Sequence, residues 1–387
     1  MNPEDWPEGL GPVACVVGAR PNFMKMAPVL RAFADHRPAI PVILVHTGQH
    51  YDKDMNDRLF EELRLPLPDI NLGVGSGTHA AQTAEVMKRF EPVLDEHKPS
   101  CILVVGDVNS TLACTLVGVK KGIPVAHVEA GLRSYDRAMP EEINRVLTDQ
   151  VADLLYTTER SALANLQREG IAEEQIHFVG NVMIDSLRAN LEFARSPADI
   201  LAGAGIGKEF VDGRGYAVVT LHRPSNVDQK ETLQSLLSVL GEVSAKLSLV
   251  FALHPRTRAN IERFGLEELV AGKRIVLLPP QGYLEMLGLM SNARLVLTDS
   301  GGVQEETTAL GVPCLTLREN TERPITVDQG TNTVVGCDRM AILDGVGKIL
   351  AGDGKRGRVP ELWDGRAAER IAEHLSRWLI ERHNNTN

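Results

Sequence analysis

The sequence predicts an α/β protein made of two similar halves, each built around a parallel β-sheet. Short apolar runs alternate with segments of helical periodicity along most of the chain. A glycine-rich, weakly patterned stretch at residues 202–215 interrupts this alternation, which then resumes. The 387 residues also exceed the roughly 250–300 that a single hydrophobic core usually serves. We therefore expect two domains.

The first half contains four apolar runs that we interpret as strands, each followed by a segment with helical spacing. The strands are Val13–Val17, Val42–Val45, Ile102–Val105 and Val125–Val128. The helices are Phe23–Ala34, Lys53–Leu63, Ser110–Lys121 and Glu141–Val151. Strands that alternate with helices in this way are typical of a parallel sheet with helices on its faces.

The second half repeats the pattern with five further strands. They are Ala217–Leu221, Leu249–Leu253, Ile275–Leu278, Leu295–Leu297 and Cys314–Leu317. A last helix, at about Arg366–Arg382, has apolar residues at helical spacing and therefore needs a surface to cover. We expect this helix to dock on one of the domains.

The composition argues against several classes of protein. The formal net charge is −10 and no long basic block occurs, so nucleic acid is not an expected partner. The first residues lack the pattern of an export signal, and no apolar run is long enough for a membrane span. We therefore expect a cytoplasmic protein without membrane insertion. The five cysteines lack the spacing of a metal site or redox motif and are expected to be reduced thiols.

Open parallel sheets bind ligands beyond the carboxyl ends of their strands, so the residues that follow each strand are candidates for a site. After the first strand come Gly18, Arg20 and Lys25, and the start of the next helix adds a partial positive charge. These features favour an anionic ligand. The structural alternative is a tight turn with solvated cations.

Three carboxylates follow later strands of the first half. Asp107 comes after the third strand, Glu129 after the fourth, and Glu141 lies at the start of the next helix. Carboxylates that lie close together beside cations acquire different pKa values, so one site can hold both a general acid and a general base. The alternatives are a helix cap at Asp107 and a structural network of these acids with Arg133 and Arg145.

The second half has polar groups at several strand ends. His222-Arg223 follow its first strand and His254-Pro255-Arg256 follow the next. A lone histidine there is more often hydrogen-bonded scaffolding, but two with nearby arginines favour phosphate binding. Ser300-Gly301-Gly302 lies between a strand and a helix, where backbone N–H groups and the helix dipole suit a diphosphate. Glu306, one turn inside that helix, suits ribose hydroxyls. The alternative here is an ordinary glycine turn.

A set of motifs runs in order from Val13 to about Gly336 and resembles the non-hydrolysing UDP-N-acetylglucosamine 2-epimerases. The segments that carry the resemblance are GARPNFMKMAPV, TGQH, VVGDVNSTLA, HVEAGLRS, MPEEINRVLTD, GNVMIDSL, LHRP, LTDSGGVQEE and LRENTERP. The resemblance implies two Rossmann-like domains of the GT-B architecture, with a cleft between them and a C-terminal helix that returns to the first domain. The expected boundaries are 1–182 with 366–387 for the first domain and 183–365 for the second, UDP-binding domain. It also implies a homodimer with no cofactor and no metal.

The resemblance also assigns roles to residues. It implies that Arg20 and Lys25 face the substrate and that Asp107, Glu129 and Glu141 are the acid/base carboxylates. It implies that Arg145 anchors the diphosphate or organises the carboxylates. The residues implied to hold the UDP portion, with His222 also close to the chemistry, are His222, Ser300, Gly301, Gly302, Glu306 and Arg323.

The expected reaction inverts C2 of UDP-N-acetylglucosamine by eliminating UDP to a 2-acetamidoglucal and adding it back. A hydrolysing 2-epimerase, a glycosyltransferase and a non-enzymatic UDP-sugar sensor are the alternatives. A 2-epimerase of a UDP-2,3-diacetamido-uronic acid is a further one, because the stretch Gly73–His79 resembles the branch that contains such enzymes and archaeal members. Tyr51-Asp52 stands where many bacterial members have an arginine linked to activation by a second UDP-sugar, so such activation is not expected. Pro224-Ser225 likewise replaces a bacterial segment that contains a glutamate.

Overall fold

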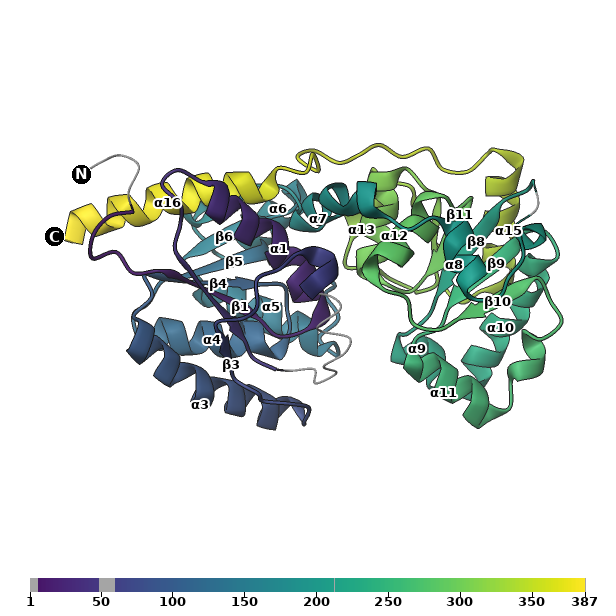
Figure 1. Cartoon of the computed structure of the whole chain (residues 1–387), viewed down its shortest axis with the longest axis horizontal. Coiled ribbons are helices and arrows are strands. Elements are labelled where there is room, and N and C mark those ends of the chain that lie inside the picture. Colours follow the sequence, from purple (N-terminus) through teal and green to yellow (C-terminus); the bar gives the residue numbers. More distant parts are fainter. Residues whose placement is uncertain (1–5, 49–59, 212, 387) are drawn as a thin grey trace. The chain divides into compact units, whose positions relative to one another are not determined.

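The structure, a computed structural model, describes residues 6–48, 60–211 and 213–386 (Figure 1). The side chains of Arg20, Lys208 and Thr386 lie outside the described part. The chain divides into two compact units: the first is Met1–Ala189 with Glu361–Asn387, and the second is Asn190–Pro360. Each unit contains one parallel sheet, which confirms the predicted α/β class.

The sheet of the first unit has the strand order β3-β2-β1-β4-β5-β6-β7, and all its described pairs are parallel. The four predicted strands are confirmed. Three more were not predicted, because two are too short for a periodic signal and β6 follows a helix directly. The strands are β1 Val13–Val17, β2 Val42–His46, β3 Ile70–Asn71, β4 Cys101–Val105, β5 Val125–Ala130, β6 Leu154–Thr157 and β7 Ile176–Phe178.

Helices cover both faces of this sheet. Figure 1 shows α1 and α16 on one face and α3, α4 and α5 on the other. The predicted helix at 53–63 lies largely outside the described residues. The α-helices of the first unit are α1 Arg20–Asp35, α3 His79–His97, α4 Asn109–Lys120, α5 Pro140–Val151, α6 Arg160–Arg168, α7 Val182–Asn190 and α16 Ala367–Thr386.

The sheet of the second unit has the order β10-β9-β8-β11-β12-β13 and is also parallel. Its five predicted strands are confirmed, and the three-residue β13 was not predicted. The strands are β8 Tyr216–Thr220, β9 Ser248–Ala252, β10 Ile275–Leu278, β11 Leu295–Thr298, β12 Cys314–Thr316 and β13 Asn332–Val334. The α-helices are α8 Pro197–Gly203, α9 Pro224–Val227, α10 Lys230–Ser244, α11 Pro255–Phe264, α12 Tyr283–Ser291, α13 Gly301–Leu310, α14 Pro324–Asp328 and α15 Arg339–Ala351.

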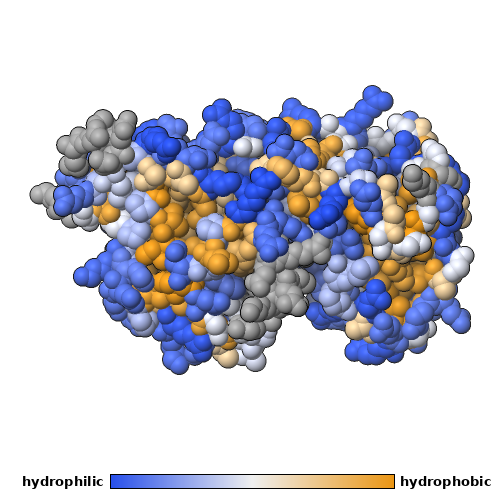
Figure 2. Space-filling model, viewed as in Figure 1, coloured by the Kyte–Doolittle hydropathy of each residue, from blue (hydrophilic) through white to orange (hydrophobic). Residues whose placement is uncertain are grey.

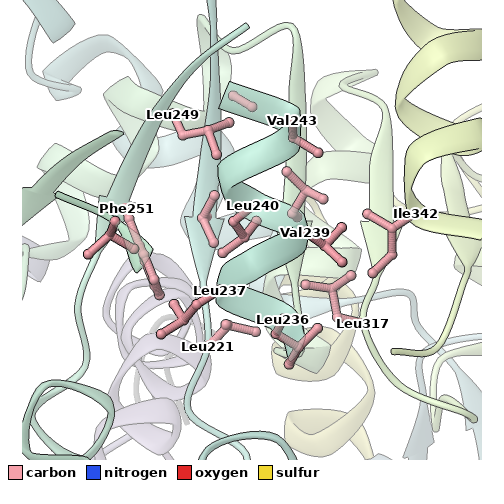
Figure 3. Packing of buried hydrophobic residues seen from close by; sticks show 14 of the residues in the cluster. Leu221, Leu236, Leu237, Val239, Leu240, Val243, Leu249, Phe251, Leu317 and Ile342 are labelled. Atoms are coloured by element: carbon pink, nitrogen blue, oxygen red, sulfur yellow. The ribbon is translucent and has the colours of Figure 1, made fainter. Parts of the chain in front are cut away.

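The core of the second unit shows why its strands are continuously apolar. Alternate residues of each strand enter opposite layers, so Leu249 and Phe251 face one core and Val250 faces the other. Figure 3 shows α10 presenting Leu236, Leu237 and Leu240 to the first of these layers. A strand that is buried on both faces has no polar side to alternate with its apolar side.

The C-terminal helix docks on the first unit, as predicted. α16 packs against α1, and the Tyr156 hydroxyl lies 3.0 Å from Nδ1 of His374 on α16. The Asp185 carboxylate accepts hydrogen bonds from the first N–H groups of the helix, those of Ala367 (3.2 Å) and Ala368 (2.7 Å). These contacts satisfy donors that a helix start otherwise leaves unpaired.

Hydrophilic residues cover much of the visible face of the molecule, with hydrophobic residues gathered in patches on both units (Figure 2). Within the described ranges, no helix combines the length and the apolar character that crossing a membrane requires.

A pair of histidines lies where α16 meets the sheet of the first unit. The rings of His177 and His374 are 3.7 Å apart between centroids, at an interplanar angle of 39°. Burial, together with the nearby His374, lowers the pKa of His177 to about 4, and burial also lowers the pKa of His374. Protonation of either ring therefore opposes this contact.

We predict that acidification destabilises the first unit, because unfolding releases both rings to their ordinary pKa of about 6.5. The unfolded chain then binds more protons than the folded one, so stability is lost as the pH falls from about 6.5 towards 4. Urea titrations followed by tryptophan fluorescence report on this unit, since Trp6, Trp363 and Trp378 all belong to it. His177→Phe should weaken the pH dependence.

The matched control is Ile176→Val, which removes one buried methyl group from the same strand and no titrating group. It should lower the free energy of unfolding equally at both ends of the pH range. An unchanged pH dependence in His177→Phe would contradict the assignment to the histidine pair.

Candidate functional site

The strand order of each sheet reverses once, between β1 and β4 in the first unit and between β8 and β11 in the second. Such a switch point, at the carboxyl ends of the strands, is where open α/β sheets bind their ligands. Asp107 and Glu129 lie at the ends of β4 and β5, and His222 and Ser300 follow β8 and β11. The sequence candidates therefore fall where the topology favours a site.

In the first unit, Lys25 on α1 forms an ion pair with Glu129 at the end of β5. Both side chains are buried. Glu129 has a left-handed backbone, with φ at 73°, and the register of β5 with β6 shifts at this residue. A left-handed glutamate in a bulge is unfavourable unless its surroundings hold it, and such conformations gather at functional sites.

Gly106, at the end of β4, makes this ion pair sterically possible. Its φ is +67°, and a Cβ atom added there would lie 2.9 Å from Nζ of Lys25. Its N–H donates to the Val128 carbonyl at 3.1 Å, which ties the ends of β4 and β5 together. Any larger residue would push the lysine away from Glu129.

Asp107 lies next to this pair and is bound from α5. Nη2 of Arg145 is 2.5 Å from Oδ2 of Asp107, and the Asn144 side chain donates to the Asp107 carbonyl at 2.9 Å. Nη1 of Arg145 lies 3.2 Å from Glu142. The guanidinium of Arg145 thus bridges Asp107, a predicted site residue, and Glu142, which was not predicted to be one.

Glu142 organises the loop before α5. Its Oε2 accepts from the backbone N–H and the hydroxyl of Ser134, both at 2.9 Å, and its Oε1 accepts from the Tyr135 N–H at 2.9 Å.

Glu141 is different: it makes no hydrogen bond or ion pair with any residue that the structure describes. It precedes Asn144 and Arg145 by three and four residues, so it lies on the same face of α5. Asp107 and Glu129 follow the neighbouring strands β4 and β5, and Glu141 lies in the first turn of the helix that comes after β5.

A buried polar network beneath this edge was not predicted as part of the site. The His127 ring lies 2.7 Å from Asp149 through Nδ1 and 2.7 Å from the Gly106 carbonyl through Nε2. Arg133 contacts the same Asp149 at 2.7 Å. Burial alone raises the pKa of Asp149, but His127 and Arg133 outweigh it and hold that pKa below its usual range. His127 and Asp149 thereby fix the backbone at the end of β4.

Two first-half candidates cannot be placed. Arg20 begins α1, but its side chain lies outside the described part. Tyr51-Asp52, which replaces the arginine of many bacterial members, lies outside the described residues.

In the second unit, Ser300, Gly301 and Gly302 form the start of α13. No described residue accepts from the N–H groups of Gly301, Gly302 or Val303, while the Gln304 N–H donates back to Ser300. A Cβ atom added to Gly301 would lie 2.7 Å from Oε1 of Glu322. Gly301 therefore leaves room for the Glu322 carboxylate beside the start of α13. The N–H groups of that helix start can bind an anion.

Arginines surround that carboxylate. Arg318 contacts Glu322 at 2.8 Å and Arg223 contacts it at 3.2 Å. Burial opposes ionisation of Glu322, but Arg323, Arg318 and Arg223 lower its pKa to about 2. Arg323, a predicted UDP-binding residue, pairs with Glu305 at 2.9 Å.

Glu306 is buried inside α13, beside the Tyr283 hydroxyl of α12. Burial and the charge of Glu306 together raise the pKa of Tyr283 well above its usual range. The tyrosine therefore stays protonated and can donate to the carboxylate.

Asp299 immediately precedes Ser300 and belongs to the segment LTDSGGVQEE, but it was not predicted to be a site residue. It is fully buried, and one of its oxygens lies 2.9 Å from Nδ1 of His222. A sequence signal existed, because a charged residue just beyond the apolar run Leu295–Leu297 is expected to be buried and then needs a partner. Its partner, three strand connections away in sequence, was not evident from the sequence.

Comparisons with known proteins show which family this chain resembles. The family model described as UDP-N-acetylglucosamine 2-epimerase matches residues 33–376. A UDP-N-acetylglucosamine 2-epimerase of Methanococcus maripaludis is 41% identical over 90% of this chain and 96% of its own. A UDP-2,3-diacetamido-2,3-dideoxy-D-glucuronate 2-epimerase of Pseudomonas aeruginosa is also 41% identical, over 94% of this chain and 99% of its own.

Solved structures are similar over nearly the whole chain. The crystal structure of the Methanocaldococcus jannaschii UDP-GlcNAc 2-epimerase in complex with UDP-GlcNAc and UDP has a TM-score of 0.85 and 42% identity. It covers 94% of this chain and 99% of that one. The Neisseria meningitidis UDP-GlcNAc 2-epimerase bound to UDP-GlcNAc has a TM-score of 0.82 and 30% identity, with 94% and 99% coverage. The expected GT-B class is confirmed by these neighbours.

The neighbouring glutamates of α5 allow a stability test. We predict that Glu142→Ala lowers the free energy of unfolding by about 3–5 kcal/mol, because Arg145 loses a buried partner and two backbone donors lose their acceptor. Glu141→Ala, its matched control, should change it by no more than about 0.5 kcal/mol. Urea unfolding measures both. Equal destabilisation by the two variants would contradict the distinction drawn here.

Proposed function

Since the chain belongs to the UDP-N-acetylglucosamine 2-epimerase family, we propose that it interconverts UDP-N-acetylglucosamine and UDP-N-acetylmannosamine without releasing UDP. The proposal is supported by Asp107 and Glu129, which lie at the ends of neighbouring strands and are each paired with a cation, and by Glu141 at the start of the next helix. A protein that only binds a UDP-sugar needs the nucleotide-binding groups but has no use for three such carboxylates.

The chemistry explains why carboxylates are needed. The C2 hydrogen of an acetamido sugar is not next to a carbonyl group, so its simple removal is slow. Elimination avoids this difficulty: a carboxylate takes the C2 proton, a C1–C2 double bond forms, and UDP leaves C1 with the bonding electrons. Protonation of C2 from the opposite face and return of a diphosphate oxygen to C1 complete the inversion. A well-placed general base contributes about 10²–10⁴-fold to such a step.

We assign the acid and base roles to Asp107, Glu129 and Glu141 as a set. Lys25 and Arg145 each bind one of these carboxylates, so they keep negative charges close together at the sheet edge. Glu141 makes no such bond within the described part of the chain and is the member that is free to approach the sugar. Arg20 is assigned to the substrate by resemblance alone.

The second unit is assigned to the UDP portion. The N–H groups of Gly301 and Gly302, with Ser300, would bind the diphosphate, and each donor directed at developing negative charge is worth roughly 3 kcal/mol. Glu306 would accept from the ribose hydroxyls. His222 and Arg323 complete this set, and the arginines around Glu322 add positive charge behind the helix start.

Sequence identity alone does not distinguish the two candidate sugar nucleotides, because relatives named for either substrate are 41% identical to this chain. The structural neighbour with UDP-GlcNAc in its crystals, at 42% identity and a TM-score of 0.85, favours the N-acetylhexosamine. We therefore assign UDP-N-acetylglucosamine as the substrate in preference to a diacetamido-uronic acid.

The proposal extends to a homodimer and to the cytoplasm. Ile143, Leu147 and Val151 follow one another at four-residue intervals on α5 and are 42%, 47% and 36% exposed. An exposed apolar stripe on one helix face supports contact with a second copy.

All five cysteines are free thiols, which suits a reducing compartment.

Product analysis tests the proposed function. Purified protein is incubated with UDP-N-acetylglucosamine, and the products are followed by ¹H and ³¹P NMR. We expect UDP-N-acetylmannosamine to appear while the diphosphate linkage stays intact. Free UDP with free N-acetylmannosamine would instead identify a hydrolysing enzyme. Conversion of the diacetamido-uronic acid nucleotide alone would overturn the assigned substrate.

A further inference from the structure

A buried carboxylate and a half-exposed imidazole meet at the switch point of the second unit. Asp299, at the end of β11, is fully buried, and His222, at the end of β8, is 36% exposed in its side chain. Oδ1 of Asp299 lies 2.9 Å from Nδ1 of His222. One edge of the ring therefore faces the protein and the other faces outward.

Asp299 is held in place by four further bonds. It accepts from the backbone N–H of His222 through both oxygens, at 3.1 and 3.0 Å. Its Oδ2 also accepts from the Arg223 N–H at 3.0 Å and from the Asn226 side chain at 3.1 Å. Asn226 is itself fixed, because it donates to the Leu317 carbonyl at 2.8 Å. The carboxylate cannot turn away from the ring without losing these bonds.

This arrangement decides which ring nitrogen carries the proton. Burial raises the pKa of Asp299, but the hydrogen bond from the His222 ring and those from the backbone N–H groups of Arg223 and His222 outweigh it, so that pKa lies below its usual range. An ionised carboxylate only accepts hydrogen bonds, so Nδ1 of His222 must donate. Nε2 is then left on the exposed edge of the ring, without the hydrogen in the neutral form.

We propose that Asp299 is a positioning residue for the reaction: it fixes His222 with Nδ1–H toward itself and Nε2 toward the diphosphate. The proposal rests on the proposed function. When the anionic diphosphate binds, the ring takes up a second proton at Nε2 and lies between two anions. Its Nε2–H then donates a charge-assisted hydrogen bond that strengthens as the departing UDP gains negative charge.

The other charged and titratable groups around the ring come from several elements. Arg223 is adjacent in sequence but is directed to Glu322, with which it pairs at 3.2 Å. The His254 ring, after β9, lies 5.8 Å from that of His222, and its Nδ1 accepts from the Arg256 N–H at 3.2 Å. Cys337 contacts Asn226 at 3.5 Å. Asp299 is therefore the group that bonds directly to the His222 ring among these residues.

The first test uses the unaltered protein. ¹⁵N-labelled histidine is incorporated, and the tautomer of His222 is read from its ring ¹⁵N shifts and couplings, with His222→Gln used to assign the signals. We expect the neutral ring to carry its hydrogen on Nδ1 and saturating UDP to add one on Nε2. A neutral ring with its hydrogen on Nε2, or a ring that UDP leaves unchanged, would overturn the proposal.

The second test is Asp299→Asn. Three donors point at Oδ2, so the amide oxygen should stay there and the amide NH₂ should face the ring. Nδ1 must then accept, and the hydrogen moves to Nε2 of a neutral ring. We expect kcat to fall by about 10–10²-fold and the ¹⁵N pattern to switch to the Nε2–H tautomer. In a His222→Gln background, Asp299→Asn should cost little more, because its effect acts through the ring.

The matched control is Asp185→Asn, another buried aspartate that accepts two backbone N–H bonds and, among the described residues, bonds to no histidine. It should keep kcat within about two-fold, because Asp185 bonds to the start of α16 and is assigned no part in the reaction. Equal losses of kcat in both variants, or additive losses in the double variant, would make Asp299 merely structural.

The two proposals fail in different ways. If the protein does not epimerise its sugar nucleotide, the proposed function fails, but the tautomer of His222 in the unaltered protein still tests the role of Asp299. If the protein is active and the ring carries its hydrogen on Nε2, the role of Asp299 fails alone.

Discussion

The ion pair between Lys25 and Glu129 is the contact on which the candidate site of the first unit depends. A Cβ atom at residue 106 would lie 2.9 Å from the lysine ammonium and would force one of them to move, and the paired Glu129 has a left-handed backbone. Removing one partner of a buried pair leaves an uncompensated charge, at a cost of about 3–5 kcal/mol. The strain at the end of β5 is therefore supported by electrostatics and by the network of His127 and Asp149 below it.

The second unit also places buried carboxylates, Asp299 and Glu322, after its strands. Asp299 contacts the partly exposed His222 ring. Glu322 is paired with arginines and lies beside Gly301 at the start of α13. The acids of this unit thus orient donors toward an anion, whereas those of the first unit are available for proton transfer.

The sequence predicted the parts that depend on local pattern. Apolar runs marked nine strands, and the polar residues after them marked the switch points, because parallel sheets expose only those ends. It could not predict β3 or β13, which are too short for periodicity, nor the long-range contacts. Glu142 holds a loop because that loop folds back to bring the Ser134 and Tyr135 N–H groups to it, and Asp299 holds His222 because β8 pairs with β11. Neither contact can be predicted from local pattern.

In the proposed reaction, the carboxylates of the first unit invert C2 by removing and returning its proton. Incubation with UDP-N-acetylglucosamine in D₂O, followed by NMR of the C1 and C2 positions, tests it most directly. Elimination exchanges the C2 proton with a base that equilibrates with solvent, so both epimers should acquire deuterium at C2. Epimers that form with hydrogen fully retained at C2 would contradict the account.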